Sequence, residues 1–137
     1  MIVGAGGFGR EVLNWARETW PEQSRVISGF LSADPEKLAD HACSLPVVAD
    51  PATFEPQPGD ALLLAIGIQG VRRRAVEILL TRGAHFLTLI HPSAVVVTTA
   101  SIGMGSIVCP GAVVSDATRV GRFGLVNFHA SIAHDAS

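Results

Sequence analysis

The stretch AVVVTTASIGMGSIVCPGAVVSDATRVGRFGLVNFHASI, residues 94–132, repeats an aliphatic residue at every sixth position. The aliphatic series is Val96, Ile102, Val108, Val114, Val120, Val126 and Ile132. A small residue stands two positions before each of them, at Ala94, Ala100, Ser106, Ala112, Thr118, Gly124 and Ala130. Neither a helix, with a period of about 3.6 residues, nor a strand, with a period of about 2, repeats in this way, whereas a β-helix of hexapeptide repeats does. The pattern predicts that residues 91–137 begin a β-helix, with the aliphatic side chains inside and the small residues at its corners.

Residues 1–90 show a different pattern, in which short apolar stretches alternate with helical ones. We expect strands at 1–3, 25–31, 46–48, 60–66 and 85–90, helices at 10–19 and 71–82, and a further helix start at Asp34-Pro35. This alternation favours a parallel sheet flanked by helices. The predicted fold class is therefore α/β plus β-helix: a Rossmann-like parallel sheet over residues 1–90, followed by the first coils of a β-helix over residues 91–137.

Composition narrows the function classes. The chain of 137 residues has a net charge of −2, and Arg72-Arg73-Arg74 is its longest basic run, so we do not expect a nucleic-acid partner. Cys43 and Cys109 are far apart, and no histidine pair has metal-ligand spacing, so neither a disulfide framework nor a metal site is indicated and a cytoplasmic location is the default. No apolar run reaches the roughly 18 residues of a membrane span, and the first residues already look like a strand rather than a secretory leader.

A glycine-rich loop, GAGGFGREV at 4–12, follows the first expected strand. Gly4, Gly6 and Gly9 fit the G-x-G-x-x-G pattern, in which backbone N–H groups and a helix N-terminus receive phosphates. In that pattern Gly4 and Gly6 permit the tight turn and close approach, and Gly9 lets the helix pack on the strand. Gly7 and Phe8 belong to the same candidate loop. A glycine turn that binds no ligand is the alternative.

The residues around this loop favour a nucleotide-sugar over NAD. An NAD site calls for an acidic residue at the end of the second strand, but Ser32 and Ala33 stand there, with Asp34 just beyond. Gly67 follows a predicted buried strand, where ligands of open parallel sheets bind, although an ordinary strand-exit turn would also use a glycine. Arg72 either reaches a phosphate or lies on a solvated helix face.

Six stretches resemble a known family. They are GAGGFGREV (4–12), GFLSADPEKL (29–38), LPVVAD (45–50), LLLAIGIQGVRRR (62–74), LIHPSAVV (89–96) and VNFHASIAHDAS (126–137). Together with the hexads, they resemble the sugar O-/N-acetyltransferases of the sialic acid O-acetyltransferase NeuD and PglD/PglB type. The resemblance implies a nucleotide-sugar domain followed by a left-handed β-helix, acetyl-CoA as co-substrate, a UDP- or CMP-linked sugar as acceptor, no metal, and a homotrimer. The later coils of the family's β-helix have no counterpart in these residues.

The resemblance also implies the catalytic residues. His134 matches the family's general base, Asp135 its acidic neighbour, and Asn127 an asparagine that helps to place the acceptor group. A histidine can take the proton from an attacking amine near neutral pH, and a carboxylate on its other ring nitrogen fixes the tautomer. The alternative is a polar corner residue with no chemistry. His91 is expected to mark the junction of the two halves, and His129 to lie near the same cleft or to cap a turn.

The expected function is acetyl transfer from acetyl-CoA to an amino or hydroxyl group of a nucleotide-linked sugar, in surface-glycan or sialic acid-type sugar biosynthesis. Because the family's acetyl-CoA groove uses later coils and a neighbouring subunit, we expect residues 1–137 alone to be inactive or nearly so. One alternative is a nucleotide-sugar-binding module without catalysis. The other is an incomplete NAD-binding oxidoreductase.

Overall fold

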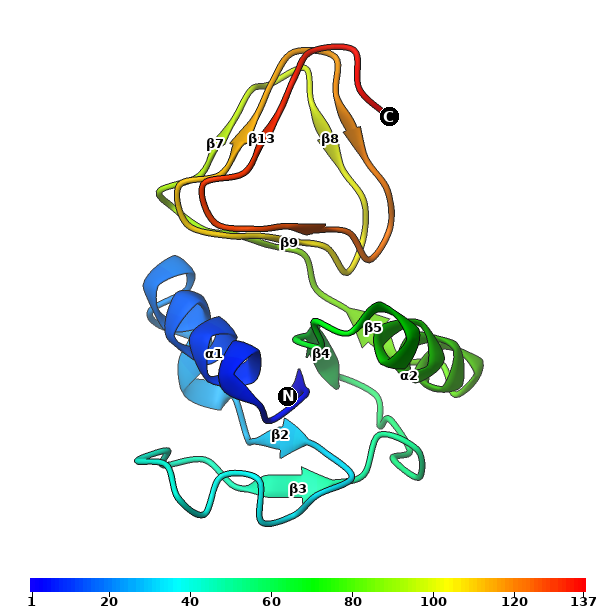
Figure 1. Cartoon of the computed structure of the whole chain (residues 1–137). Helices are drawn as coiled ribbons and strands as arrows, with labels where there is room; N and C mark the ends of the chain where they lie inside the picture. Colours follow the sequence, from blue (N-terminus) through cyan, green and yellow to red (C-terminus); the bar gives the residue numbers. More distant parts are fainter.

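The computed structural model describes residues 1–137 and has two parts, a sheet flanked by helices and a triangular coil (Figure 1). The sheet contains β1 (Ile2–Val3), β2 (Phe30–Leu31), β3 (Val47–Ala49), β4 (Ala61–Leu64) and β5 (His85–Phe86). The strand order is β3-β2-β1-β4-β5, and every pair is parallel. This confirms the parallel sheet that the alternating pattern predicts.

Two helices cover the two faces of this sheet. Helix α1 (Gly7–Thr19) packs on the face that carries Ile2, and helix α2 (Gln69–Thr81) packs on the face that carries Val3. Successive residues of a strand point to opposite faces, so β1, β2 and β4 each supply side chains to both cores. Neither helix has the length and apolar composition that crossing a bilayer requires.

Three local predictions were wrong. The expected strand at 25–31 is short: a 3₁₀ turn occupies Gln23–Val26, and only Phe30–Leu31 pairs, because Val26 is 83% exposed and no neighbouring strand reaches it. No helix starts at Asp34-Pro35. The Asp34 carboxylate accepts a hydrogen bond from the Glu36 amide (3.0 Å), as in a helix cap, but only turns follow.

The third error is the single strand expected at 85–90. It is divided into β5, which belongs to the sheet, and β6 (Leu89–Ile90), which pairs with β9 of the coil. The chain therefore enters the coil two residues before position 91.

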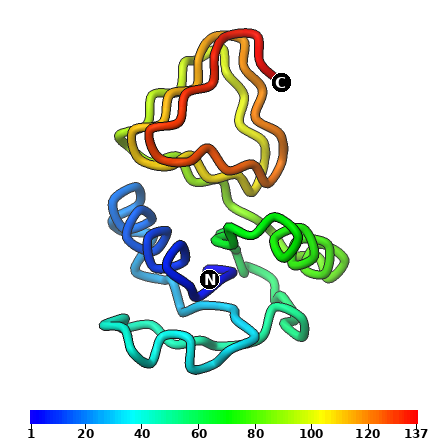
Figure 2. Tube along the Cα trace, viewed as in Figure 1, coloured from blue at the N-terminus to red at the C-terminus, as the bar shows by residue number.

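The coil consists of two-residue strands that recur every six residues. After β6 come β7 (Val95–Val96), β8 (Ser101–Ile102), β9 (Ile107–Val108), β10 (Val113–Val114), β11 (Arg119–Val120), β12 (Leu125–Val126) and β13 (Ser131–Ile132). Partners lie eighteen residues apart, as in Leu89↔Ile107 and Ile107↔Leu125. Three strands thus complete one turn, and the three resulting sheets form the sides of a triangle (Figure 2).

The interior of the coil matches the period-six prediction. All seven aliphatic residues of the series belong to one apolar cluster, in which Val108, Val114 and Val126 are buried. The small residues lie just before the strands, and Ser106 and Thr118 are fully buried. The predicted arrangement of aliphatic and small residues is therefore confirmed.

One side of the coil packs against the sheet part. The outward side chains of Leu89 and Ile107 are fully buried in the same apolar cluster as Val12 and Leu13 of α1. Cys109 lies in this cluster too, and burial raises the pKa of its thiol to about 11. The two parts therefore share a core.

A second period of six, which the sequence analysis missed, governs the corners. Left-handed backbone (positive φ) occurs at Gly105, Gly111, Ala117, Phe123, His129 and Asp135. A Cβ at Gly105 would lie 2.4 Å from the Phe123 ring, and one at Gly111 would lie 2.7 Å from the His129 ring. Side chains of the later turn thus lie over glycines of the earlier turn.

We predict that Gly105→Ala lowers the free energy of unfolding by about 1–3 kcal/mol. The φ at Gly105 is +73°, and the new methyl group would meet Phe123. Gly121→Ala is the matched control, because a Cβ there has no neighbour within 4 Å and its φ is not in the left-handed region. Urea unfolding measures both variants, and an equal loss in the two would contradict the corner argument.

Candidate functional site

The glycine loop lies where the order of the parallel sheet changes direction. From β1 the chain passes through α1 to β2 on one side, and from β4 it passes through α2 to β5 on the other. Both helices therefore begin beside the carboxyl ends of two neighbouring central strands. This crevice is where ligands bind in open parallel sheets, and the first turn of each helix leaves backbone N–H groups without intrahelical partners.

The glycines of the loop divide into two groups. Gly4 (φ +109°) and Gly9 are packing positions: a Cβ on Gly4 would lie 2.4 Å from the Ala65 carbonyl oxygen, and one on Gly9 would lie 2.0 Å from the Gly4 carbonyl oxygen. A Cβ on Gly6 or Gly67 would meet nothing within 4 Å, and one on Gly7 would meet only the end of a flexible side chain at 3.9 Å. The latter three leave the backbone open to a ligand.

Phe8 lies in the first turn of α1, and Asp34 lies beyond the end of β2, the strand next to β1. The Phe8 ring is half-buried and packs edge-on against Trp15, with ring centroids 6.0 Å apart. Asp34 is exposed beyond the end of β2, and one of its carboxylate oxygens is used by the turn that follows. No acidic side chain lies in the first turn of α1, so its N-terminal dipole is not neutralised there.

Arg72 neither reaches a phosphate nor lies on a solvated face, so both sequence-based readings were wrong. Its side chain is buried, and its guanidinium donates to carbonyl oxygens of Leu64, Ile66, Phe123 and Gly124. A guanidinium has five N–H groups, and this arrangement occupies all three of its nitrogens. Arg72 therefore has a role inside the protein rather than at a ligand.

His134 and Asp135 lie together at the corner that follows β13. The His134 Nδ1 atom is 2.7 Å from an Asp135 carboxylate oxygen, and both side chains are 75% exposed. The Asp135 amide donates to the Asp116 carbonyl oxygen of the preceding turn (3.0 Å), which fixes the corner. With Nδ1–H donating to the carboxylate, Nε2 is left as a proton acceptor facing solvent.

Asn127 lies at a different corner. It directly follows β12, and the whole of β13 separates it from His134. Its amide oxygen accepts a hydrogen bond from the Phe128 amide at 2.9 Å. A single chain therefore brings two of the three predicted catalytic residues together and leaves the third one corner away.

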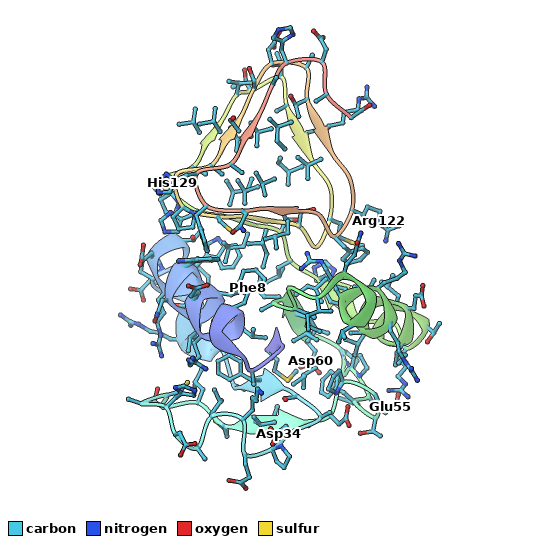
Figure 3. All side chains as sticks on the ribbon, viewed as in Figure 1. Phe8, Asp34, Glu55, Asp60, Arg122 and His129 are labelled. Carbon is cyan, nitrogen blue, oxygen red and sulfur yellow. The ribbon has the colours of Figure 1, made fainter.

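Two of the remaining histidines, His91 and His129, lie near the contact between the coil and helix α1. His91 is buried at the junction, as predicted: its Nε2 is 2.8 Å from a Glu18 carboxylate oxygen, and its Nδ1 accepts from the Ser93 amide at 3.1 Å. His129 lies at the coil corner near α1 (Figure 3), with its ring over Gly111. No group of three or more His, Cys, Asp or Glu side chains is arranged to hold a metal ion.

A cavity of about 490 Å³ lies at the opposite end of the central strands, where these strands begin. Met1, Ser28 and Ala61 line it together with Trp20. It is remote from the glycine loop because the loop follows the ends of these strands. Size alone therefore does not identify the site, and the backbone groups at the switch in strand order remain the candidate.

Comparison with known proteins gives a consistent set of relatives, although no family model matches the chain. GDP-perosamine N-acetyltransferase of Escherichia coli O157:H7 is 27% identical over 135 residues, which are 98% of this chain and 61% of the relative. The acetyltransferase domain of PglB from Neisseria gonorrhoeae, solved with acetyl coenzyme A, is 28% identical with a TM-score of 0.83, over 98% of this chain and 63% of that one. The chain is similar to sugar acetyltransferases.

A third relative is PerB from Caulobacter crescentus, solved in complex with CoA and GDP-perosamine. It is 29% identical with a TM-score of 0.80, over 98% of this chain and 62% of that one. The chain thus spans about three-fifths of the length of the relatives it matches. The similarity therefore supports the predicted resemblance to sugar acetyltransferases in general, but not to the NeuD and PglD type in particular.

Substitutions in the two groups of glycines should differ in their effect on stability. Gly9→Ala should lower the free energy of unfolding by about 1–3 kcal/mol or more, because its methyl group would collide with the Gly4 carbonyl. Gly6→Ala should change it by no more than roughly 0.5 kcal/mol, since Gly6 has extended backbone and open space. Thermal and urea unfolding measure both, and a stable Gly9→Ala variant would contradict the packing role.

Proposed function

We propose that the chain belongs to an acetyl-CoA-dependent enzyme that transfers acetyl to an amino group of a nucleotide-linked sugar. The hydrogen-bonded His134–Asp135 pair, on a coil joined to a sheet with an open glycine loop, is the observation that carries this proposal. The relatives support it: the first is a GDP-perosamine N-acetyltransferase, the second an acetyltransferase domain solved with acetyl coenzyme A, and the third, PerB, was solved with CoA and GDP-perosamine. We assign the reaction to surface-glycan or sialic acid-type sugar biosynthesis.

In this proposal residues 1–90 are a Rossmann-like nucleotide-sugar domain. Gly6, Gly7 and Gly67 let the phosphates approach the backbone, Gly4 and Gly9 hold the loop in shape, and Phe8 and Asp34 flank the ligand. The nucleotide is a guanosine diphosphate if the chain follows its perosamine-binding relative, and a uridine or cytidine nucleotide if it follows the sequence resemblance. Residues 91–137 are the start of a left-handed hexapeptide-repeat β-helix.

The chemistry assigned to the coil is general-base catalysis. The sugar amine attacks the thioester carbonyl of acetyl-CoA, and Nε2 of His134 takes the proton that the amine loses. Asp135 holds Nδ1–H and stabilises the imidazolium. The tetrahedral adduct then expels the CoA thiolate, which receives that proton. A positioned base contributes roughly 10²–10⁴-fold, and the alignment of the two substrates supplies much of the rest.

A homotrimer completes the proposed site. Because β13 separates Asn127 from His134 within one chain, we infer that Asn127 meets the His134 corner of a neighbouring copy. The side formed by β7, β10 and β13 presents the exposed aliphatic side chains of Val95 and Val113, whereas the side of β8 and β11 presents Ser101 and Arg119.

A cytoplasmic location stays a prediction from the cysteine usage.

Nucleotide-sugar binding tests the role of the sheet part. Isothermal titration of residues 1–137 with GDP-, UDP- and CMP-linked amino sugars should give binding to one of them. Gly6→Val should raise its Kd at least about tenfold, because the side chain would occupy the phosphate position, equivalent to roughly 1.4 kcal/mol. Gly121→Val, on the coil, serves as the control. Binding of NAD in place of every nucleotide sugar would favour the oxidoreductase alternative.

The role of His134 is tested by acetyl transfer, measured as release of the CoA thiol. His134→Ala should lower kcat by roughly 10²–10⁴-fold, Asp135→Asn should have a smaller effect, and His41→Gln should have none because His41 lies in a turn of the sheet part. Since residues 1–137 are expected to transfer acetyl slowly at best, the assay uses high protein concentration. Slow transfer that is as fast in His134→Ala as in the parent would contradict the role of His134.

A further inference from the structure

Arg72 is a buried cation without an acidic partner. It is 8% exposed, and no carboxylate lies within ion-pair distance of its guanidinium. Burying a charge is unfavourable unless its polar atoms are satisfied. A neutral side chain of similar length would fill this space without that cost, so the position points to a role for the donors themselves.

The donors of Arg72 join two regions that are far apart in the sequence. On one side, Nη1 donates to the carbonyl oxygens of Ile66 (3.0 Å) and Leu64 (3.4 Å), at the end of β4 and next to Gly67. On the other, Nε and Nη2 donate to the Phe123 carbonyl oxygen (3.0 and 2.9 Å), and Nη2 also to that of Gly124 (3.2 Å). One planar side chain thus binds the edge of the candidate crevice and a corner of the coil.

The corner that receives these bonds is itself held in place. The Phe123 ring packs edge-on against Phe86 of β5, with centroids 5.2 Å apart, and lies over Gly105. Figure 3 shows Arg122, the neighbour of Phe123, at the corner of the coil above α2. The corner is therefore fixed both by an apolar contact with the sheet and by the guanidinium.

Helix α1 makes the corresponding contact at the other end of the same side. Trp15 packs edge-on against Phe128 (6.1 Å between centroids), and Glu18 accepts a hydrogen bond from His91. The coil thus rests on both helices, and Arg72 supplies all the side-chain hydrogen bonds between α2 and the coil.

We propose that Arg72 is a positioning residue, which sets the orientation of the coil relative to the crevice at Gly67. The planar guanidinium can satisfy carbonyls of both regions only when they keep one relative arrangement. The purpose of this arrangement, to bring a bound sugar to the coil, rests on the proposed function. The joint, by which we mean the connection that Arg72 makes between the sheet part and the coil, does not.

The test measures the distance between the two parts by electron spin resonance of paired nitroxide labels. Labels go on Asn14→Cys in α1 and Arg119→Cys in β11, both exposed positions, in a Cys43→Ser background. Cys109 stays unlabelled because it is fully buried. Arg72→Met, Arg72→Lys and the exposed neighbour Arg73→Met are compared; arginine, lysine and methionine have similar helix propensities, so α2 is retained.

We expect the parent chain and Arg73→Met to give one narrow distance distribution. Arg72→Met should broaden it and add a population at a shifted distance, and Arg72→Lys should have an intermediate effect because an ammonium has three donors instead of five. A parent-like distribution in folded Arg72→Met overturns the proposal. If far-UV circular dichroism shows that Arg72→Met does not fold, Arg72→Lys decides: broadening supports the joint and a parent-like distribution overturns it.

Titration with the nucleotide sugar separates this proposal from the one on which it rests. The Kd should stay within about threefold of the parent in Arg72→Lys, a difference below 1 kcal/mol. If the parent itself binds no nucleotide sugar, the proposed function fails, while the distance measurement still decides the joint. A large loss of binding in Arg72→Lys would instead make Arg72 part of the binding site and overturn the positioning role.

Discussion

Backbone hydrogen bonds between segments eighteen residues apart hold the coil together. The Cys109 amide donates to the Val126 carbonyl oxygen at 2.9 Å, and the Val113 amide donates to that of Ala130 at 2.8 Å. Each turn contains three two-residue strands. Only this register therefore places every aliphatic residue of the period-six series inside the triangle. The corner that carries His134, and the side that packs on the sheet, both exist because this register is kept.

Much of this fold could be predicted from the sequence because the residues that determine it form short local patterns. The period of six can be recognised without knowing any distant contact, and the glycine-rich loop is recognised from the nine consecutive residues 4–12. The strand expected at 25–31 shows the limit: Val26 is apolar, but whether it pairs depends on a neighbouring strand that does not reach it. Local hydrophobicity cannot report that absence.

The same distinction separates the parts of the candidate site. His134 and Asp135 are adjacent in sequence, so their hydrogen bond could be expected from local geometry. The function of Arg72 could not, since its partners at Phe123 and Gly124 lie 51 and 52 positions away. Within the loop, the packing role of Gly9 was predicted, but that of Gly4 could not be, because the oxygen that meets Gly4 belongs to Ala65. Contacts of this kind become visible only when the chain is folded.

The burial of Leu89 and Ile107 in the cluster of α1 has a consequence for how such proteins diversify. A chimera with the sheet of one such protein and the coil of another would bring together side chains that do not pack well at this contact. Substitutions on the α1 face and on β6 and β9 must then accompany one another, whereas the loop at Gly6 and the corner at His134 take no part in this contact. A change confined to that loop or to that corner therefore leaves the packing between the two parts of the molecule unaltered.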